Sequence, residues 1–174
     1  MNDRREARSA GDANTTPAGQ QPRTSSAGGG ISYGSYKTLL ALTRRPELWR
    51  AGIDGSGMSN LKTMEQLEDQ TVRAFDDTEF GVLGKDDALL AEWSPITAVD
   101  KIVAPVFVYQ GVRDPITPQH EADQIVAALR RRGVPVEYML VANEGHGVTR
   151  RENAIAYLAR SYRFVVEHLA RPAR

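Results

Sequence analysis

Apolar positions along the chain predict strands and helices that alternate from residue 31 onward. Helical spacing predicts a helix that starts directly after Ser32 and ends before Pro46, and further helices over residues 61–75, 88–93, 117–132 and 155–169. An unbroken apolar run predicts a strand over residues 105–110, a second strand is predicted over residues 136–141, and residues 51–56 are a further strand candidate. Strands that alternate with helices favour an α/β fold, in which a parallel sheet carries helices on its faces.

Apolar residues at helical spacing mark four of these helices, among them the helix over residues 117–132, with Ala122, Ile125, Val126 and Leu129. The helix over residues 61–75 is acidic, and its stripe consists of Leu61, Met64, Leu67 and Val72. The last helix has a stripe of Ile155, Leu158, Tyr162, Val165 and Leu169. The acidic residues Glu65, Glu68 and Asp69 either line a pocket or solvate the helix surface, which is the commoner arrangement.

The start of the chain has a different composition. Residues 1–30 contain no Val, Ile, Leu, Phe, Tyr or Trp, so they cannot offset the entropy of ordering by burying apolar surface. We therefore expect a disordered, low-complexity tail over residues 1–29 and one folded domain over residues 30–172.

Overall composition narrows the class of protein. Lys and Arg number 22, as do Asp and Glu, and this balance argues against a nucleic-acid-binding or membrane-binding protein. Cysteine is absent, which excludes disulfides and thiolate nucleophiles. No apolar run follows the Arg4-Arg5 pair or is long enough to span a membrane. The sequence predicts a soluble, cytoplasmic protein that acts on small molecules or peptides.

Three residues of possible catalytic importance follow strands or strand-like segments, where parallel sheets place their chemistry. Ser32 lies in the pentapeptide GISYG, between Gly30 and Gly34. Asp114 lies in the loop after residues 105–110, and His146 lies between two glycines after residues 136–141. Small flanking residues suit a sharp turn that exposes the serine hydroxyl, because larger ones would clash with neighbouring chain.

A serine hydroxyl needs a base to become a good nucleophile, and the base needs an orienting carboxylate. His146 and Asp114 fit these two roles, and the order Ser, Asp, His along the chain is that of α/β-hydrolases. The backbone N–H of Tyr33 would donate a hydrogen bond to the oxyanion of a tetrahedral intermediate. A second donor should come from an earlier loop.

Each residue also has a simpler interpretation. The pentapeptide occurs in flexible loops, Asp114 before Pro115 could be a turn or helix-cap residue, and His146 could lie in a surface turn. Of the other histidines, His120 is predicted on an exposed helical face and His168 near a helix C-terminus. The combination of all three residues in the required order favours the hydrolase interpretation.

Residues 29–169 resemble the C-terminal catalytic domain of the prolyl oligopeptidase family of serine peptidases, an α/β-hydrolase fold, and most of all its acylaminoacyl-peptidase and dipeptidyl-aminopeptidase branch. The resemblance is carried by GISYGSY at 30–36, LTRRPELW at 42–49, SPI at 94–96, QGVRD at 110–114, GVPVEY at 133–138 and EGHG at 144–147. It implies Ser32 as nucleophile, Asp114 as orienting acid and His146 as base, acting on short peptides through an acyl-enzyme. It implies neither a metal nor an organic cofactor.

Two positions depart from the family pattern. Ser35 stands where the family has glycine, and the polar segment QQPRTSSA at 20–27 stands where an apolar strand should lead into the serine turn. We therefore expect an N-terminally truncated, partial α/β-hydrolase that lacks the strand supporting Ser32. Its unpaired sheet edge would favour self-association. An inactive remnant that needs a partner to complete its sheet, and a carboxylesterase with the same triad, remain the alternatives.

Overall fold

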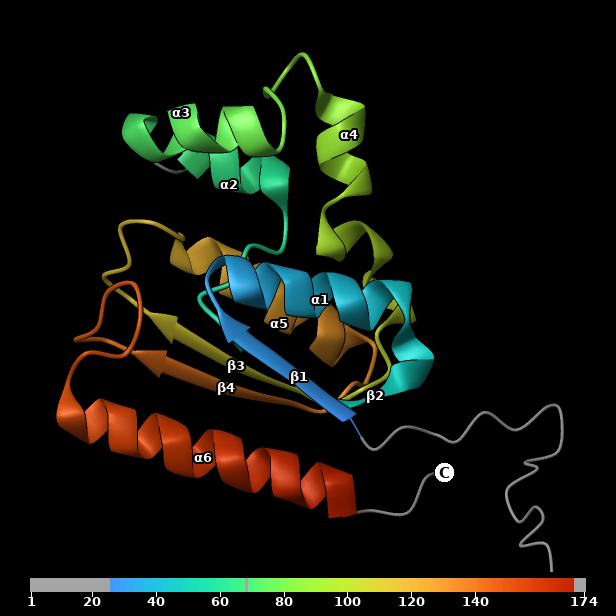
Figure 1. Cartoon of the computed structure of the whole chain (residues 1–174), viewed down its shortest axis with the longest axis vertical. Coiled ribbons are helices and arrows are strands. Elements are labelled where there is room, and N and C mark those ends of the chain that lie inside the picture. Colours follow the sequence, from blue (N-terminus) through green and yellow to red (C-terminus); the bar gives the residue numbers. More distant parts are fainter. Residues whose placement is uncertain (1–25, 68, 171–174) are drawn as a thin grey trace, which may run out of the picture.

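The structure, a computed structural model, describes residues 26–67 and 69–170. Four parallel strands form one sheet in the order β1-β2-β3-β4 (Figure 1). They are β1 (Ser26–Ile31), β2 (Trp49–Gly55), β3 (Val106–Gly111) and β4 (Val136–Val141). This confirms the predicted α/β class and the three strands expected after residue 50.

Helices cover both faces of the sheet (Figure 1). On one face α1 (Tyr33–Arg44) packs over β1 and β2, and α5 (Gln119–Arg131) packs over β3 and β4. On the other face α6 (Arg151–Ala170) runs beneath β1, β2 and β3. The short helices α2 (Leu61–Leu67), α3 (Gln70–Glu79) and α4 (Asp87–Glu92) lie beyond α1, and 3-10 turns occupy Pro46–Leu48 and Pro95–Lys101.

The strand β3 is buried throughout, and its residues Val106–Tyr109 are all apolar because both faces of the strand are covered. Val106 and Val108 point into the cluster beneath α1 and α5, whereas Phe107 and Tyr109 point into the cluster beneath α6. Successive side chains of a strand point to opposite faces, so one short segment supplies both cores. Packing on both faces of β3 therefore fixes the position of its C-terminal end, from which the loop with Asp114 begins.

The prediction that the chain lacks the strand supporting Ser32 was wrong. The strand β1 runs directly into Ser32 and pairs with β2 in register, with Gly30 opposite Asp54 and Ile31 opposite Gly55. Sheet ladders form through backbone groups, so a glycine-rich segment can complete one without apolar side chains. Residues 26–29 of the expected tail therefore belong to β1, and residues 1–25 lie outside the described residues. Within the described sheet, the outer edge of β1 is unpaired.

The single helix predicted over residues 61–75 is two helices in the structure. The helix α2 ends at Leu67, and α3 begins at Gln70 after the N-cap residue Asp69, whose carboxylate accepts a hydrogen bond of 2.8 Å from the Thr71 amide. An Asp at this position favours a new helix start over continuation of the preceding helix. The change of direction allows α3 to form one wall of the pocket described below.

The last helix was predicted correctly, but its apolar stripe does not face the core. Ile155, Leu158 and Tyr162 are 58%, 63% and 72% exposed. The buried face carries Phe164 and His168, whose rings pack with centroids 4.4 Å apart. Helical spacing identifies a helix but does not show which of two apolar faces packs on the sheet.

None of the helices among the described residues combines the length and apolar character needed to cross a bilayer. The cytoplasmic location stays a prediction.

Candidate active site

Ser32 occupies a sharp turn between β1 and α1. Its backbone has φ 58° and ψ −127°, a conformation that costs a residue with a side chain about 1–3 kcal/mol. Three backbone hydrogen bonds hold it: the Ser32 amide donates to the Gly55 carbonyl at 2.8 Å, and the Ser32 carbonyl accepts from Ser35 and Tyr36 at 2.9 Å and 3.1 Å. The turn is therefore fixed by β2 on one side and by the first turn of α1 on the other.

The two glycines that flank Ser32 differ in how strongly the turn needs them. A Cβ on Gly30 would lie 2.5 Å from the backbone carbon of Gly34, so no larger residue fits without a shift of the main chain. A Cβ on Gly34 would meet nothing within 4 Å. Crowding within the chain thus explains Gly30 but not Gly34.

Ser35, which departs from the family glycine, adds a further link to the turn. Its side chain is fully buried, and its hydroxyl donates to the Gly30 carbonyl at 2.6 Å. The same oxygen accepts from the Gly55 amide at 2.6 Å. Ser35 thereby joins β1, α1 and β2 at the residues that surround Ser32.

Asp114 and His146 come together although 32 residues separate them in the chain. The His146 Nδ1 atom lies 2.9 Å from one carboxylate oxygen of Asp114 and 3.1 Å from the other. Asp114 also accepts hydrogen bonds of 2.9 Å from the amides of Ile116 and Thr117. Asp114 is therefore both a turn residue and the partner of His146.

The charge state of Asp114 follows from these contacts. Burial alone would raise the pKa of its carboxyl group, but the hydrogen bonds from His146, Thr117 and Ile116 outweigh burial and lower that pKa. A carboxylate beside Nδ1 keeps the ring proton on that nitrogen, which leaves Nε2 to accept a proton. Within the described part of the chain, no hydrogen bond joins the Ser32 hydroxyl to the His146 ring; such bonds often form only when a substrate is bound.

Glu144 organises the loop that carries His146, a role that no motif in the sequence indicated. Its buried carboxylate accepts hydrogen bonds from the amides of Thr149 and Arg150 and from the side chain of Asn153. Burial opposes its ionisation, but these bonds lower its pKa to about 2. Glu144 therefore stays ionised and anchors the loop to the start of α6.

The backbone N–H of Tyr33 is placed as predicted, at the first residue of α1. No acceptor for it is found among the described residues, as is usual for the first N–H groups of a helix. The Tyr33 hydroxyl donates a hydrogen bond of 2.7 Å to Glu79, and this bond, with burial, raises the pKa of the tyrosine.

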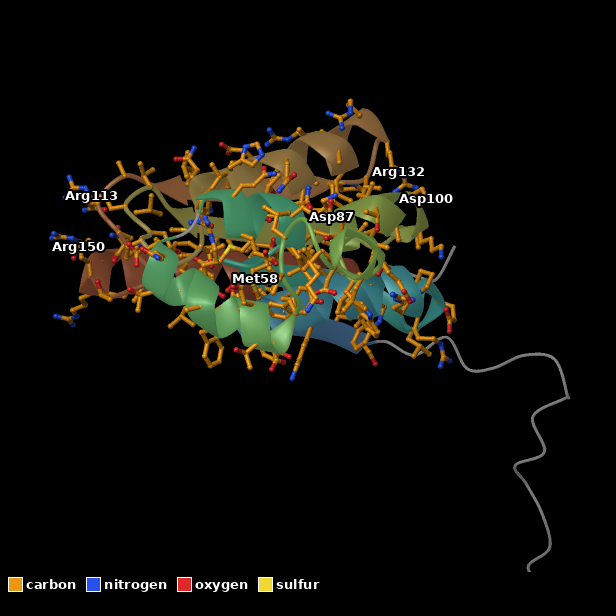
Figure 2. All side chains as sticks on the ribbon, turned by 90° about the horizontal axis from the view of Figure 1, so that it is seen from above. Met58, Asp87, Asp100, Arg113, Arg132 and Arg150 are labelled. Carbon is orange, nitrogen blue, oxygen red and sulfur yellow. The ribbon has the colours of Figure 1, made fainter. Side chains whose placement is uncertain are left out.

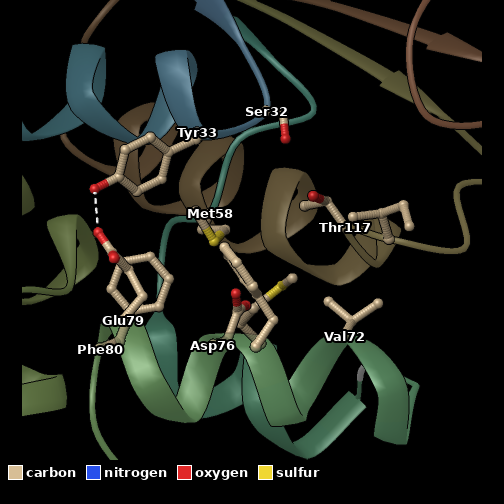
Figure 3. A pocket seen from close by; sticks show the side chains of 11 residues that line it. Ser32, Tyr33, Met58, Val72, Asp76, Glu79, Phe80 and Thr117 are labelled. Atoms are coloured by element: carbon tan, nitrogen blue, oxygen red, sulfur yellow. Dashed lines mark hydrogen bonds between the residues drawn. The ribbon is translucent and has the colours of Figure 1, made fainter.

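A cavity of about 400 Å³ opens beside Ser32 and is bounded below by α3 (Figure 3). Two carboxylates, Asp76 and Glu79, line it together with apolar side chains. Neither was singled out from the sequence, because an acidic residue on an amphipathic helix ordinarily faces solvent. Of the acidic residues that were considered, Glu65 is buried and accepts from the Leu83 amide, Asp69 caps α3, and Glu68 lies outside the described residues.

Arg113 and Arg150 lie in the loops that carry Asp114 and His146. Figure 2 shows Arg113 and Arg150 at one end of the molecule, with their side chains directed outward. Across residues 26–67 and 69–170, no group of three or more Asp, Glu or His side chains could hold a metal ion.

The fold and this arrangement of loops define the α/β-hydrolase class. The structure superimposes on a puromycin-hydrolyzing peptidase of Mycobacterium tuberculosis with a TM-score of 0.79 and 24% identity, over 85% of this chain and 22% of that one. It superimposes on an acylaminoacyl peptidase in complex with Z-Gly-Gly-Phe-chloromethyl ketone with a TM-score of 0.76 and 22% identity, over 85% and 24% of the two chains.

Sequence comparison defines the family. The model of the prolyl oligopeptidase family matches residues 21–171. Dipeptidyl aminopeptidase BIII of Pseudoxanthomonas mexicana is 38% identical over 145 residues, which are 80% of this chain and 21% of the relative. Dipeptidyl peptidase family member 6 of Caenorhabditis elegans is 36% identical over 132 residues, which are 72% of this chain and 18% of the relative. The chain belongs to the prolyl oligopeptidase family and spans about a fifth of the length of these relatives.

Proposed function

We propose that this chain carries the catalytic centre of a serine peptidase that hydrolyses short peptides through Ser32, His146 and Asp114. The Ser32 hydroxyl attacks the substrate carbonyl while His146 Nε2 takes its proton, and Asp114 holds the Nδ1–H tautomer. The negative charge on the carbonyl oxygen falls beside the Tyr33 amide. His146 then protonates the leaving amine, and water releases the acyl group from Ser32 by the same route.

The contact of 2.9 Å between His146 and Asp114 is the observation that carries this proposal. This contact lies at the same edge of the sheet as Ser32. The strands β1, β3 and β4 are parallel, and Ser32, Asp114 and His146 follow their respective C-terminal ends. The names of the relatives support peptides as the substrates, since they are dipeptidyl peptidases.

A fluorophosphonate probe tests the role of Ser32 directly. We expect the purified chain to be labelled at Ser32, and the Ser32→Ala variant to remain unlabelled. Ser161→Ala, a variant on α6, serves as the control and should be labelled like the wild type. A folded wild-type chain that the probe does not label would refute the proposal and favour the alternative of an inactive remnant.

A carboxylesterase would use the same residues, so the substrate distinguishes the two. We expect the wild-type chain to hydrolyse both an aminoacyl anilide and the matching short-chain ester. In the His146→Ala variant, kcat/KM should fall by a similar factor for both substrates. Turnover of the ester with no detectable turnover of the anilide would identify an esterase instead.

Self-association through the outer edge of β1 is the second part of the proposal. An unpaired strand edge presents amide and carbonyl groups that another chain can bind. Mass measured by light scattering should rise with protein concentration; a mass equal to one chain at every concentration would contradict this part alone.

A further inference from the structure

The cavity beside Ser32 combines an apolar wall with two carboxylates. Six apolar side chains line it: Met58, Met64, Val72, Phe75, Phe80 and Ile116. The carboxylates of Asp76 and Glu79 are the charged groups of the lining, which contains no Lys or Arg among the described residues. Such a surface fits a ligand that has a long aliphatic part and a positive charge.

The acidic groups lie across the cavity from the reactive hydroxyl. Figure 3 shows the Ser32 side chain at one side of the cavity and Asp76 on α3 at the opposite side, with its carboxylate directed toward Met58. Asp76 is only 7% exposed, and Glu79 is fixed by the hydrogen bond from Tyr33. A side chain that enters beside Ser32 therefore crosses apolar surface before it reaches the two carboxylates.

The position of the cavity relative to His146 indicates which part of a peptide it receives. The leaving amine must lie beside His146, which supplies its proton, and His146 does not line the cavity. Tyr33, whose amide would donate to the oxyanion in the proposed mechanism, does line it. The cavity is therefore placed for the side chain of the residue whose carbonyl Ser32 attacks.

We propose that this cavity selects substrates with lysine or arginine at the residue whose carbonyl is attacked, through Asp76 and Glu79. The aliphatic stem of either side chain packs against the methionines and phenylalanines, and its cationic end forms charge-assisted hydrogen bonds with the carboxylates. This inference rests on the proposed role of Ser32 as nucleophile and names the substrate class that the site takes.

A pair of covalent probes tests the preference separately from the chemistry. Benzyloxycarbonyl-lysine diphenyl phosphonate and its norleucine counterpart differ only in the terminal amine. In both, Ser32 Oγ forms a bond to phosphorus, phenoxide leaves, and the serine proton passes through His146 to give phenol. We expect the full chain to react at least about tenfold faster with the lysine probe, as charge-assisted hydrogen bonds allow. A smaller ratio, or a faster norleucine probe, would overturn the inference.

Variants assign the preference to the two carboxylates. The double variant Asp76→Asn, Glu79→Gln should bring the ratio of the two rates close to one. Glu92→Gln removes one negative charge from an exposed position on α4 outside the cavity, so it should keep the wild-type ratio. If the Asp76→Asn substitution prevents folding of the double variant, Glu79→Gln is tested alone. Glu79 is exposed, so this single variant should fold, and the loss of its charge should still lower the ratio of the two rates. An unchanged ratio in a folded variant would overturn the inference.

The fluorophosphonate probe separates the two possible failures. Labelling of Ser32 by that probe, together with equal rates for lysine and norleucine, would refute the charge preference and leave the proposed function intact. Absence of labelling by all three probes would refute the proposed function and the preference with it.

Discussion

The Ser35 hydroxyl donates a hydrogen bond of 2.6 Å to the carbonyl oxygen of Gly30, two residues before Ser32. The first turn of α1 is thereby tied to the glycine-rich strand β1, which has few side chains with which to pack. The Gly55 amide completes the link by donating to the same Ser35 oxygen. Polar contacts to the backbone thus hold the serine turn where apolar packing is weak.

Ser35→Ala should destabilise this turn. The variant leaves the Gly55 amide and the Gly30 carbonyl without this partner in a buried place, and we expect the free energy of unfolding to fall by about 1–3 kcal/mol. Urea denaturation measures the loss, and the rate of fluorophosphonate labelling should fall as well. Ser161→Ala is the matched control, because the Ser161 hydroxyl makes only a long bond of 3.3 Å. Equal stabilities of the two variants would contradict the link.

Alanine at the two flanking glycines should have opposite effects. Gly30→Ala places a Cβ 2.5 Å from the Gly34 backbone and should lower the free energy of unfolding by about 1–3 kcal/mol. Gly34→Ala meets open space within a helix, so stability should stay unchanged or rise by up to about 1 kcal/mol. Thermal denaturation of both variants checks this. A Gly34→Ala variant as unstable as Gly30→Ala would show that the turn is crowded on both sides.

Asp114→Asn should lower activity far more than stability. The asparagine oxygen can still accept from the amides of Ile116 and Thr117, but its NH₂ group would favour the wrong tautomer of His146. We expect kcat to fall by about 10⁴-fold on a peptide substrate. Asp100→Asn, at the end of the molecule opposite Arg113 (Figure 2), should retain activity. A fall of less than about tenfold would show that Asp114 does not orient His146.

Asp54 should make the folded state less stable as pH rises, whereas a carboxylate with a lowered pKa makes it more stable. It is 1% exposed, and burial raises its pKa to about 7, although hydrogen bonds from the Ser35 side chain and the Gly57 backbone act in the opposite direction. An unfolded Asp loses its proton near pH ~4, so the folded state binds the extra proton between these values. The free energy of unfolding should therefore fall as pH rises from about 4 to 7, by up to about 1.4 kcal/mol per pH unit.

Urea denaturation of wild type and Asp54→Asn at about pH 4.5 and about pH 7.5 measures this dependence. Relative to wild type, the variant should be more stable at the higher pH than at the lower one, because Asn carries no titrating proton. Asp123→Asn, an exposed substitution, is measured at the same two pH values as the control. A constant difference between wild type and Asp54→Asn would mean that Asp54 does not titrate in this range.

Several features could be predicted because they are local. The apolar run from Val106 to Tyr109 identified a buried strand, and the spacing of Ile125 and Leu129 identified a helix. The order of Ser32, Asp114 and His146 in three strand-end loops identified the candidate site. Residues near each other in the chain determine the helix and strand patterns, so the sequence alone was sufficient for the fold class. It also selected Ser32, Asp114 and His146 as candidates, and their catalytic roles stay a prediction.

Other features depend on contacts between distant segments. The strand β1 forms because its backbone pairs with β2, and its own residues carry little sign of a strand. The stripe of Ile155, Leu158 and Tyr162 predicted a helix, but packing against the sheet selected the face with Phe164. Asp76 and Glu79 became part of a cavity only because α3 turns away from α2.

The sequence by itself therefore determined the class of fold and the identity of the candidate catalytic residues. Only the tertiary structure decided that Ser32 has a supporting strand, that Ser35 ties that strand to α1 and β2, and that two carboxylates line the neighbouring cavity. The physical reason is that periodicity and motifs express interactions between near neighbours, whereas strand pairing, burial and cavities arise from residues that meet only when the chain folds.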